Sequence, residues 1–119
     1  MRFHIDHRHN LWIGTRYWGL YVIDHETRKC TNYLREGMAR QVNVIFEDRF
    51  HNIWVGNEDG LFQFIPNTDS TDFNIYKYFS NKSGTSTLSG NFVTAIFEDS
   101  EGYIWVGTVG NGLSRFYND

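Results

Sequence analysis

An all-β fold made of β-propeller blades is predicted by this sequence, and two observations support it. A short apolar motif centred on tryptophan occurs three times, as Leu11–Thr15 (LWIGT), Ile53–Asn57 (IWVGN) and Ile104–Thr108 (IWVGT). The tryptophans lie 42 and then 51 residues apart, which is close to the repeat length of propeller blades. No segment shows sustained helical periodicity, and the 18% of aromatic residues favours strands.

Each repeat is expected to form four short antiparallel strands, the usual content of one blade. In the second repeat these are Val42–Asp48, Asn52–Asn57, Leu61–Ile65 and Phe73–Phe79. The same order fits residues 3–7, 10–15, 20–24 and 29–34 in the first repeat, and residues 92–98, 103–108 and 113–117 in the third. The predicted blades therefore span residues 1–35, 42–79 and 92–119, the third without its outer strand, and together they form one partial propeller.

The turn between the first two strands of each blade has its own pattern. Asp6, Asp48 and Asp99 open these turns, where a short carboxylate can accept backbone N–H groups. Gly102 closes the third turn, and glycine is preferred where φ is positive. His9 and His51 hold the matching positions, and we expect positive φ there too.

The composition excludes several classes of partner. Eleven Lys and Arg face 14 Asp and Glu, for a net charge of −3, and no basic cluster suggests nucleic-acid binding. No run of about 18 apolar residues is present, so we expect no membrane contact by this segment. The N-terminus lacks the apolar run of a signal peptide. The single cysteine, Cys30, cannot form a disulfide within the chain.

Catalytic residues, metal ligands and cofactors are all expected to be absent. His4, His7 and His9 resemble a metal-binding cluster, but strand alternation would place His4 on the opposite face from the other two. No cysteine or carboxylate cluster stands at ligand spacing beside them. The pairs Glu47–Asp48 and Glu98–Asp99 should point in opposite directions, whereas a general acid and base must converge. The three repeated tryptophans are expected to fill the space between blades.

A ligand is expected to contact one face of the blades, which carries the loops that join the second strand to the third. The same face carries the loops from an outer strand to the next blade, at residues 36–41 and 81–91. Exposed aromatic rings beside a guanidinium suit a sugar ring or a peptide. The candidate ligand-binding residues on these loops are Arg16, Tyr17, Trp18, Glu58, Asp59 and Asn111. Two alternatives for Trp18 stay open: it covers the top of its own blade, or it contacts another subunit.

The third repeat, Val93 to Phe116, closely resembles the two-component regulator propeller repeat, V-x-x-I-x-E-D-x-x-G-x-I-W-V-G-T-x-x-x-G-L-x-R-F. The second repeat, Val42 to Phe64, matches with His51 for the glycine and Asn57 for the threonine. The first matches well from Leu11 to Leu20. The resemblance implies a sensor ectodomain of a bacterial, often hybrid, two-component histidine kinase, periplasmic or extracytoplasmic in the parent protein.

Three functions follow as hypotheses. The favoured one is a ligand-sensing or signal-transmitting propeller segment, with an oligosaccharide as a possible ligand because many such sensors respond to glycan breakdown products. The second is a scaffold for protein–protein interaction that senses nothing. The third is a propeller hydrolase or lyase, since fold alone does not fix function. The expected partners are other blades of a parent propeller or another copy of this chain, because three blades leave two blade faces uncovered.

Overall fold

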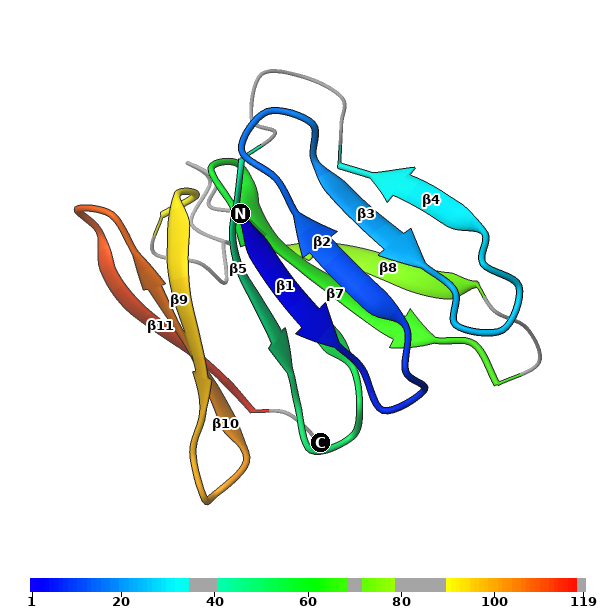
Figure 1. Ribbon diagram of the computed structural model, residues 1–119. Helices are drawn as coiled ribbons and strands as arrows, with labels where there is room; N and C mark the ends of the chain where they lie inside the picture. Colours follow the sequence, from blue (N-terminus) through cyan, green and yellow to red (C-terminus); the bar gives the residue numbers. More distant parts are fainter. Residues whose placement is uncertain (35–40, 69–71, 79–89, 118–119) are drawn as a thin grey trace.

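The structure is a computed structural model that describes residues 1–34, 41–68, 72–78 and 90–117. These residues form eleven β-strands in three antiparallel sheets, which fan out side by side (Figure 1). The first sheet contains β1 (Arg2–Ile5), β2 (Leu11–Gly14), β3 (Leu20–Ile23) and β4 (Cys30–Tyr33). The second contains β5 (Val42–Glu47), β6 (Ile53–Asn57), β7 (Gly60–Pro66) and β8 (Phe73–Tyr78). The third contains β9 (Val93–Glu98), β10 (Tyr103–Thr108) and β11 (Gly112–Tyr117).

The predicted all-β blade fold is confirmed, with small differences at strand ends. β1 ends at Ile5 rather than at residue 7, because the Asp6 turn begins there. β7 extends to Pro66, since this end of the strand pairs with the start of β8 at Phe73. Residues 35, 79, 118 and 119, at the predicted ends of the blades, lie outside the described residues. Within the described residues no helix is long and apolar enough to cross a membrane.

The hydrophobic core lies between blades rather than within one. Trp12 is fully buried, and its ring meets the rings of Phe64 and Phe73 of the second blade edge-on, at centroid distances of 5.3 and 5.1 Å. Trp54 occupies the same position one blade later, in a cluster with Val93 and Ile96 of the third blade. Each of these tryptophans therefore packs against the blade that follows it, as the sequence predicts.

Adjacent blades approach most closely at the glycine of each tryptophan motif. A Cβ atom on Gly14 would lie 2.5 Å from Cγ1 of Val42, and one on Gly56 would lie 2.4 Å from Cγ1 of Val93. Real Cβ atoms do not come this close to another atom, so both sites accept glycine alone without movement of a neighbour. These contacts set the spacing of the inner strands β1, β5 and β9.

The outward face of the third blade is open. Trp105 stands opposite Phe97 of β9 and Arg115 of β11, and directly paired residues share one face of a sheet. Phe97 and Leu113 are largely exposed, and Arg115 lies over the Trp105 ring at 5.5 Å. This face corresponds to the faces on which Trp12 and Trp54 are buried, so it carries the kind of apolar side chains that pack against a neighbouring blade.

Candidate functional site

The aspartate that opens each turn forms the same hydrogen bonds in all three blades. One carboxylate oxygen accepts the backbone N–H groups two and four residues later, and the other accepts the indole Nε1–H six residues later. The indole bonds of Trp12, Trp54 and Trp105 are each 2.8 Å long. These aspartates therefore fix the turn and the tryptophan. The indole bond was not predicted, although the constant spacing of six residues was a signal for it.

Positive φ at the end of these turns is confirmed. His9 and His51 both have φ of 67°, and Gly102 has φ of 92°. The two histidines hold a conformation that is unusual for residues other than glycine. Their imidazoles are thereby placed at the edge of the blades where the turns lie.

In the second and third blades, the glutamate before the turn aspartate links its blade to the preceding one. Glu98 accepts the backbone N–H of Arg49 at 2.9 Å and its Nε–H at 3.1 Å. Glu47 accepts the backbone N–H of His7, the equivalent residue of the first blade, at 3.2 Å. The two carboxylates of each pair thus have different partners, as the sequence predicts, and the glutamate joins the turn of its neighbour.

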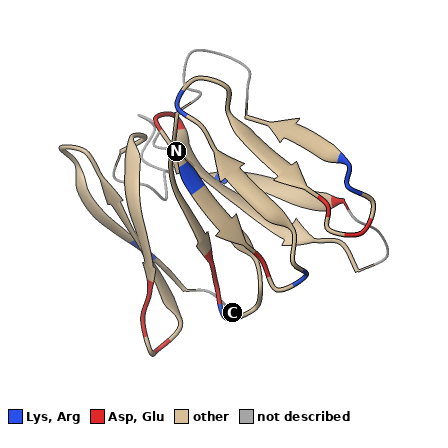
Figure 2. Ribbon diagram, in the orientation of Figure 1, with Lys and Arg blue, Asp and Glu red and all other residues tan. Residues whose placement is uncertain are grey.

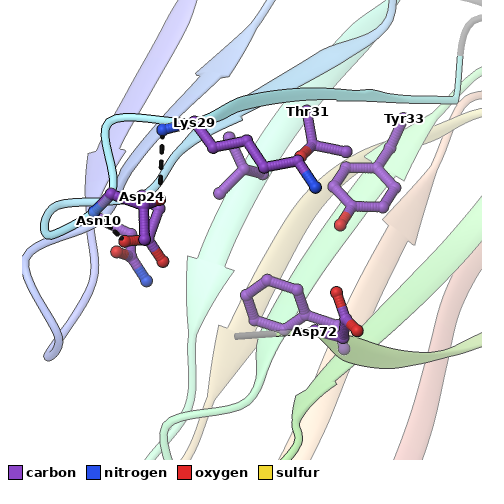
Figure 3. Close-up of a pocket in the computed structure, with 9 residues that line it drawn as sticks. Asn10, Asp24, Lys29, Thr31, Tyr33 and Asp72 are labelled. Atoms are coloured by element: carbon purple, nitrogen blue, oxygen red, sulfur yellow. Dashed lines mark hydrogen bonds between the residues drawn. The ribbon is translucent and has the colours of Figure 1, made fainter. Parts of the chain in front are cut away.

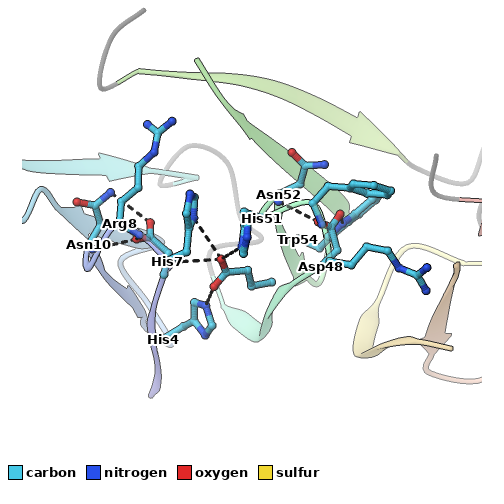
Figure 4. A network of polar contacts seen from close by, with 12 residues as sticks. His4, His7, Arg8, Asn10, Asp48, His51, Asn52 and Trp54 are labelled. Atoms are coloured by element: carbon cyan, nitrogen blue, oxygen red, sulfur yellow. Dashed lines mark hydrogen bonds and ion pairs between the residues drawn. The ribbon is translucent and has the colours of Figure 1, made fainter. Parts of the chain in front are cut away.

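Three imidazoles surround Glu47 at the junction of the first and second blades (Figure 4). His4 Nε2 lies 2.7 Å from Oε1, while His51 Nδ1 and His7 Nδ1 lie 3.0 and 3.4 Å from Oε2. The rings of His7 and His51 stack at a centroid distance of 4.0 Å. The prediction that His4 and His7 face opposite ways was wrong, because strand alternation stops at Ile5 and the turn brings His7 back.

The electrostatics of Glu47 favour its ionised form. Partial burial raises the pKa of the Glu47 carboxyl, but hydrogen bonds from His4, His51 and the backbone of His7 outweigh it. The net pKa lies below its ordinary value. This cluster was not predicted from the sequence, because His51 and Glu47 come from a different blade than His4 and His7.

The strand-connecting loop of the first blade presents the predicted aromatic pair. Tyr17 and Trp18 are each 63% exposed, and the Arg16 guanidinium lies 5.4 Å from the Tyr17 ring centroid. Most of the Trp18 surface therefore faces solvent. The loop backbone is held in place, since the Trp18 N–H donates to Thr15 Oγ1 at 2.9 Å and Asn32 Nδ2 donates to the Trp18 carbonyl at 3.0 Å.

The other candidate residues lie on separate loops of the same edge. Glu58 is half-buried, and exposed Asp59 forms an ion pair with Lys77. Exposed Asn111 donates to the Val109 carbonyl within its own turn. In the described part of the chain, no hydrogen bond, ion pair or ring contact joins one candidate loop to another. Each loop therefore offers its side chains independently.

Elsewhere, the surface of the described residues has two hollows. The smaller hollow has a volume of about 30 Å³, similar to the volume that one water molecule occupies in the liquid (Figure 3). Its lining residues include Asn10, Asp24, Lys29, Thr31, Tyr33 and Asp72. The other, of about 300 Å³, runs along β1, β5 and β9 and includes Arg2, Asn43 and Thr94. Lys and Arg are scattered over the described residues and do not gather into one patch (Figure 2).

Three stacked antiparallel blades, of four, four and three strands in the described residues, have their inner strands side by side and tryptophans between the sheets. This arrangement defines the chain as a segment of a β-propeller. Residues 87–110 match the family model described as Two component regulator propeller, so the third blade carries a repeat of that family. No curated protein matches the sequence.

Solved structures show the same fold. Two crystal structures of the extracellular domain of BT4673 from B. thetaiotaomicron superpose with a TM-score of 0.70 at 23% identity. One is described as a one component system and the other as a hybrid two component system. Each match covers 95% of this chain and 14% of the larger chain, so this chain spans a small part of that domain's length.

Proposed function

We propose that this chain is a segment of the sensing propeller of a two-component sensor histidine kinase, located outside the cytoplasm in its parent protein. The family repeat at residues 87–110 supports this assignment. The shared fold with the extracellular domain of a hybrid two component system supports it further. In this proposal ligand binding shifts the population between two arrangements of the sensor.

The ligand-binding surface in this proposal is the loop of Arg16, Tyr17 and Trp18, and the ligand is an oligosaccharide. The observation that carries it is the exposure of two adjacent aromatic rings on a hydrogen-bonded loop. Such rings offer flat apolar faces that need no reorganisation, and the Arg16 guanidinium can donate to hydroxyl groups. Glu58, Asp59 and Asn111 supply further polar groups on the same edge of the blades.

Titration with a panel of neutral oligosaccharides, followed by tryptophan fluorescence and calorimetry, tests this surface. We expect Trp18→Ala to weaken binding by about tenfold, the upper end of what one aromatic contact contributes. Tyr76→Ala is the matched control, because Tyr76 is an exposed aromatic residue on outer strand β8 and is not one of the candidate ligand-binding residues. Equal binding by the wild type and Trp18→Ala would contradict the assignment.

A second candidate function, a protein-interaction scaffold, is favoured by the open blade faces. Phe97, Leu113 and Tyr117 are exposed on the third blade, and Phe3 and Ile5 on the first. Covering about 400 Å² of apolar surface would contribute roughly 10 kcal/mol before the costs of association. We therefore expect self-association at micromolar concentration. A single 14.0 kDa species in sedimentation would contradict this expectation.

We propose that the segment itself is not an enzyme. A hydrolase or lyase needs titratable groups that converge on one substrate atom. Arg16 and the Glu58–Asp59 pair lie on separate loops, and the Asp6, Asp48 and Asp99 carboxylates are held in structural hydrogen bonds.

A further inference from the structure

The cluster of His7, Glu47 and His51 brings three metal-ligand side chains together across a blade junction. One donor atom from each residue lies within 4.8 Å of the other two. His7 comes from the turn after β1, Glu47 from the end of β5, and His51 from the turn after β5. The folded arrangement of two blades is therefore required to bring them together.

The distances in this cluster fit a four-coordinate cation. Zn²⁺ binds imidazole nitrogen and carboxylate oxygen at 2.0–2.2 Å, which places tetrahedral ligands about 3.3 Å apart. Nδ1 of His7 and Nδ1 of His51 lie 3.4 and 3.0 Å from Oε2 of Glu47. Both imidazoles thus present the same ring nitrogen to the same oxygen at about this separation. Their rings stack at a centroid distance of 4.0 Å, so they must rotate about χ angles for both in-plane lone pairs to point at one cation.

The surroundings of Glu47 have the features of a supported ligand. His4 Nε2 lies 2.7 Å from the other carboxylate oxygen, Oε1, and so orients the group while Oε2 faces the two Nδ1 atoms. Carboxylate ligands of metals are commonly held in this way by a further hydrogen bond. His7 and His51 are exposed on their outer sides, so a cation can enter from solvent and keep water as a fourth ligand.

The second blade junction provides a comparison for the three imidazoles. There, Glu98 accepts bonds from the backbone N–H and the Nε–H of Arg49 in the preceding turn. His7 occupies the position of Arg49, so its backbone bond to Glu47 corresponds to the link at the second junction. At the first junction His4 and His51 also contact the glutamate, and both bring metal-ligand nitrogens to it.

We propose that His7, Glu47 and His51 bind a divalent transition-metal cation of the zinc class, with His4 positioning the carboxylate. The cation bridges the first and second blades, on the edge opposite the Arg16–Trp18 loop. This site is independent of the proposed ligand-binding function, and either proposal can fail without the other.

The test is calorimetric titration of the tag-free full chain, after chelator treatment and dialysis, with ZnCl₂. Co²⁺ then serves as a spectroscopic probe, since nitrogen and oxygen ligation changes its visible absorption. We expect one equivalent per chain and an increased unfolding temperature with Zn²⁺, because a ligand that binds the folded state stabilises it. His7→Arg, which restores the side chain of the second junction, should keep the fold and weaken binding by at least about tenfold.

His51→Asn and His9→Asn form a matched pair, since both positions have φ of 67° and asparagine tolerates that region. His51→Asn should lose binding, whereas His9→Asn should retain it, because the His9 ring lies against His25 outside the cluster. Circular dichroism confirms that each variant is folded. Absence of saturable Zn²⁺ and Co²⁺ binding by the wild type overturns the proposal. Binding by His7→Arg or His51→Asn at wild-type affinity also overturns it.

Discussion

The glycines of the three tryptophan motifs provide an internal comparison of closed and open blade junctions. Gly14 and Gly56 meet a valine of the next inner strand, where an added Cβ would lie 2.5 and 2.4 Å from a methyl carbon. At Gly107 the nearest atoms to an added Cβ are Ala95 Cβ and Leu113 Cδ2, at 3.5 and 3.7 Å. These are ordinary contacts. Alanine should therefore be costly at the first two glycines and tolerated at the third.

The magnitude follows from two opposing effects. Overpacking a well-filled junction costs about 1–3 kcal/mol, because buried Val93 is stiff about χ1 and cannot easily move its methyl groups. Alanine also reduces the freedom of the unfolded chain, which returns about 0.4–1 kcal/mol. Gly56→Ala should thus lower the free energy of unfolding by about 1.3 kcal/mol, the difference between the midpoints of these ranges, and by about 2.6 kcal/mol at most. Gly107→Ala should leave it unchanged or increase it by up to about 1 kcal/mol.

Urea denaturation of the three variants, followed by tryptophan fluorescence at concentrations low enough to keep the chain monomeric, measures these differences directly. At this chain length each kcal/mol corresponds to about 4 °C in unfolding temperature, so thermal scans give a second readout. Equal destabilisation by Gly107→Ala and Gly56→Ala would refute the reasoning, because the open face of the third blade would then be covered in solution. An unchanged stability of both Gly14→Ala and Gly56→Ala would show that the junctions are loosely packed.

Three further predictions concern the turns. Asp48→Asn should lower the free energy of unfolding by about 1–3 kcal/mol, because an amide in place of the carboxylate leaves the buried Trp54 indole N–H without its acceptor. Chemical denaturation measures this loss, and a smaller value would mean that the bond is dispensable. Hydrogen bonds from the Trp105 indole and from backbone N–H groups hold the pKa of Asp99 below its ordinary value. The contribution of Asp99 to stability is therefore complete above the unfolded pKa of about 3.9, and it is lost as pH falls through the folded pKa. Stability measured by fluorescence from neutral pH to about pH 2 should therefore decline at the acid end, and an acid loss unchanged in Asp99→Asn would contradict this. His9→Gly should stabilise the fold by a few tenths to about 1 kcal/mol, because glycine relieves the strain of the positive φ. His51→Gly should stabilise it by less, since it also loses the hydrogen bond to Glu47. Urea midpoints that rank the two variants in the opposite order would disprove the comparison.

The blade architecture could be predicted from the sequence because its signals are local and repeated. The tryptophan motif, the aspartate that opens each turn and the residue that closes it recur at fixed spacing, and the structure confirms strands and positive φ at His9 and His51. Burial of Trp12 and Trp54 between blades also follows, since a large apolar side chain in a repeated strand needs a neighbouring sheet.

The side-chain cluster could not be predicted because it depends on contacts between blades. His7 and Glu47 are forty residues apart, and strand periodicity says nothing about which turn a neighbouring glutamate reaches. Strand alternation holds at His4 but not at His7, because β1 ends at Ile5. The exposure of the Arg16–Trp18 loop was predicted by its position between strands, whereas its hydrogen bonds to Thr15 and Asn32 needed the structure.

The glutamate links between blades all run in one direction along the chain. The carboxylate at the end of an inner strand accepts the turn of the blade made before it, as Glu47 and Glu98 both show. The aspartate–tryptophan bond, by contrast, is complete within each blade. During synthesis on the ribosome, a newly emerged blade can therefore form its own turn at once. When the following inner strand is synthesised, its glutamate accepts the N–H group of this turn. The links between blades can therefore form in order from the N-terminus.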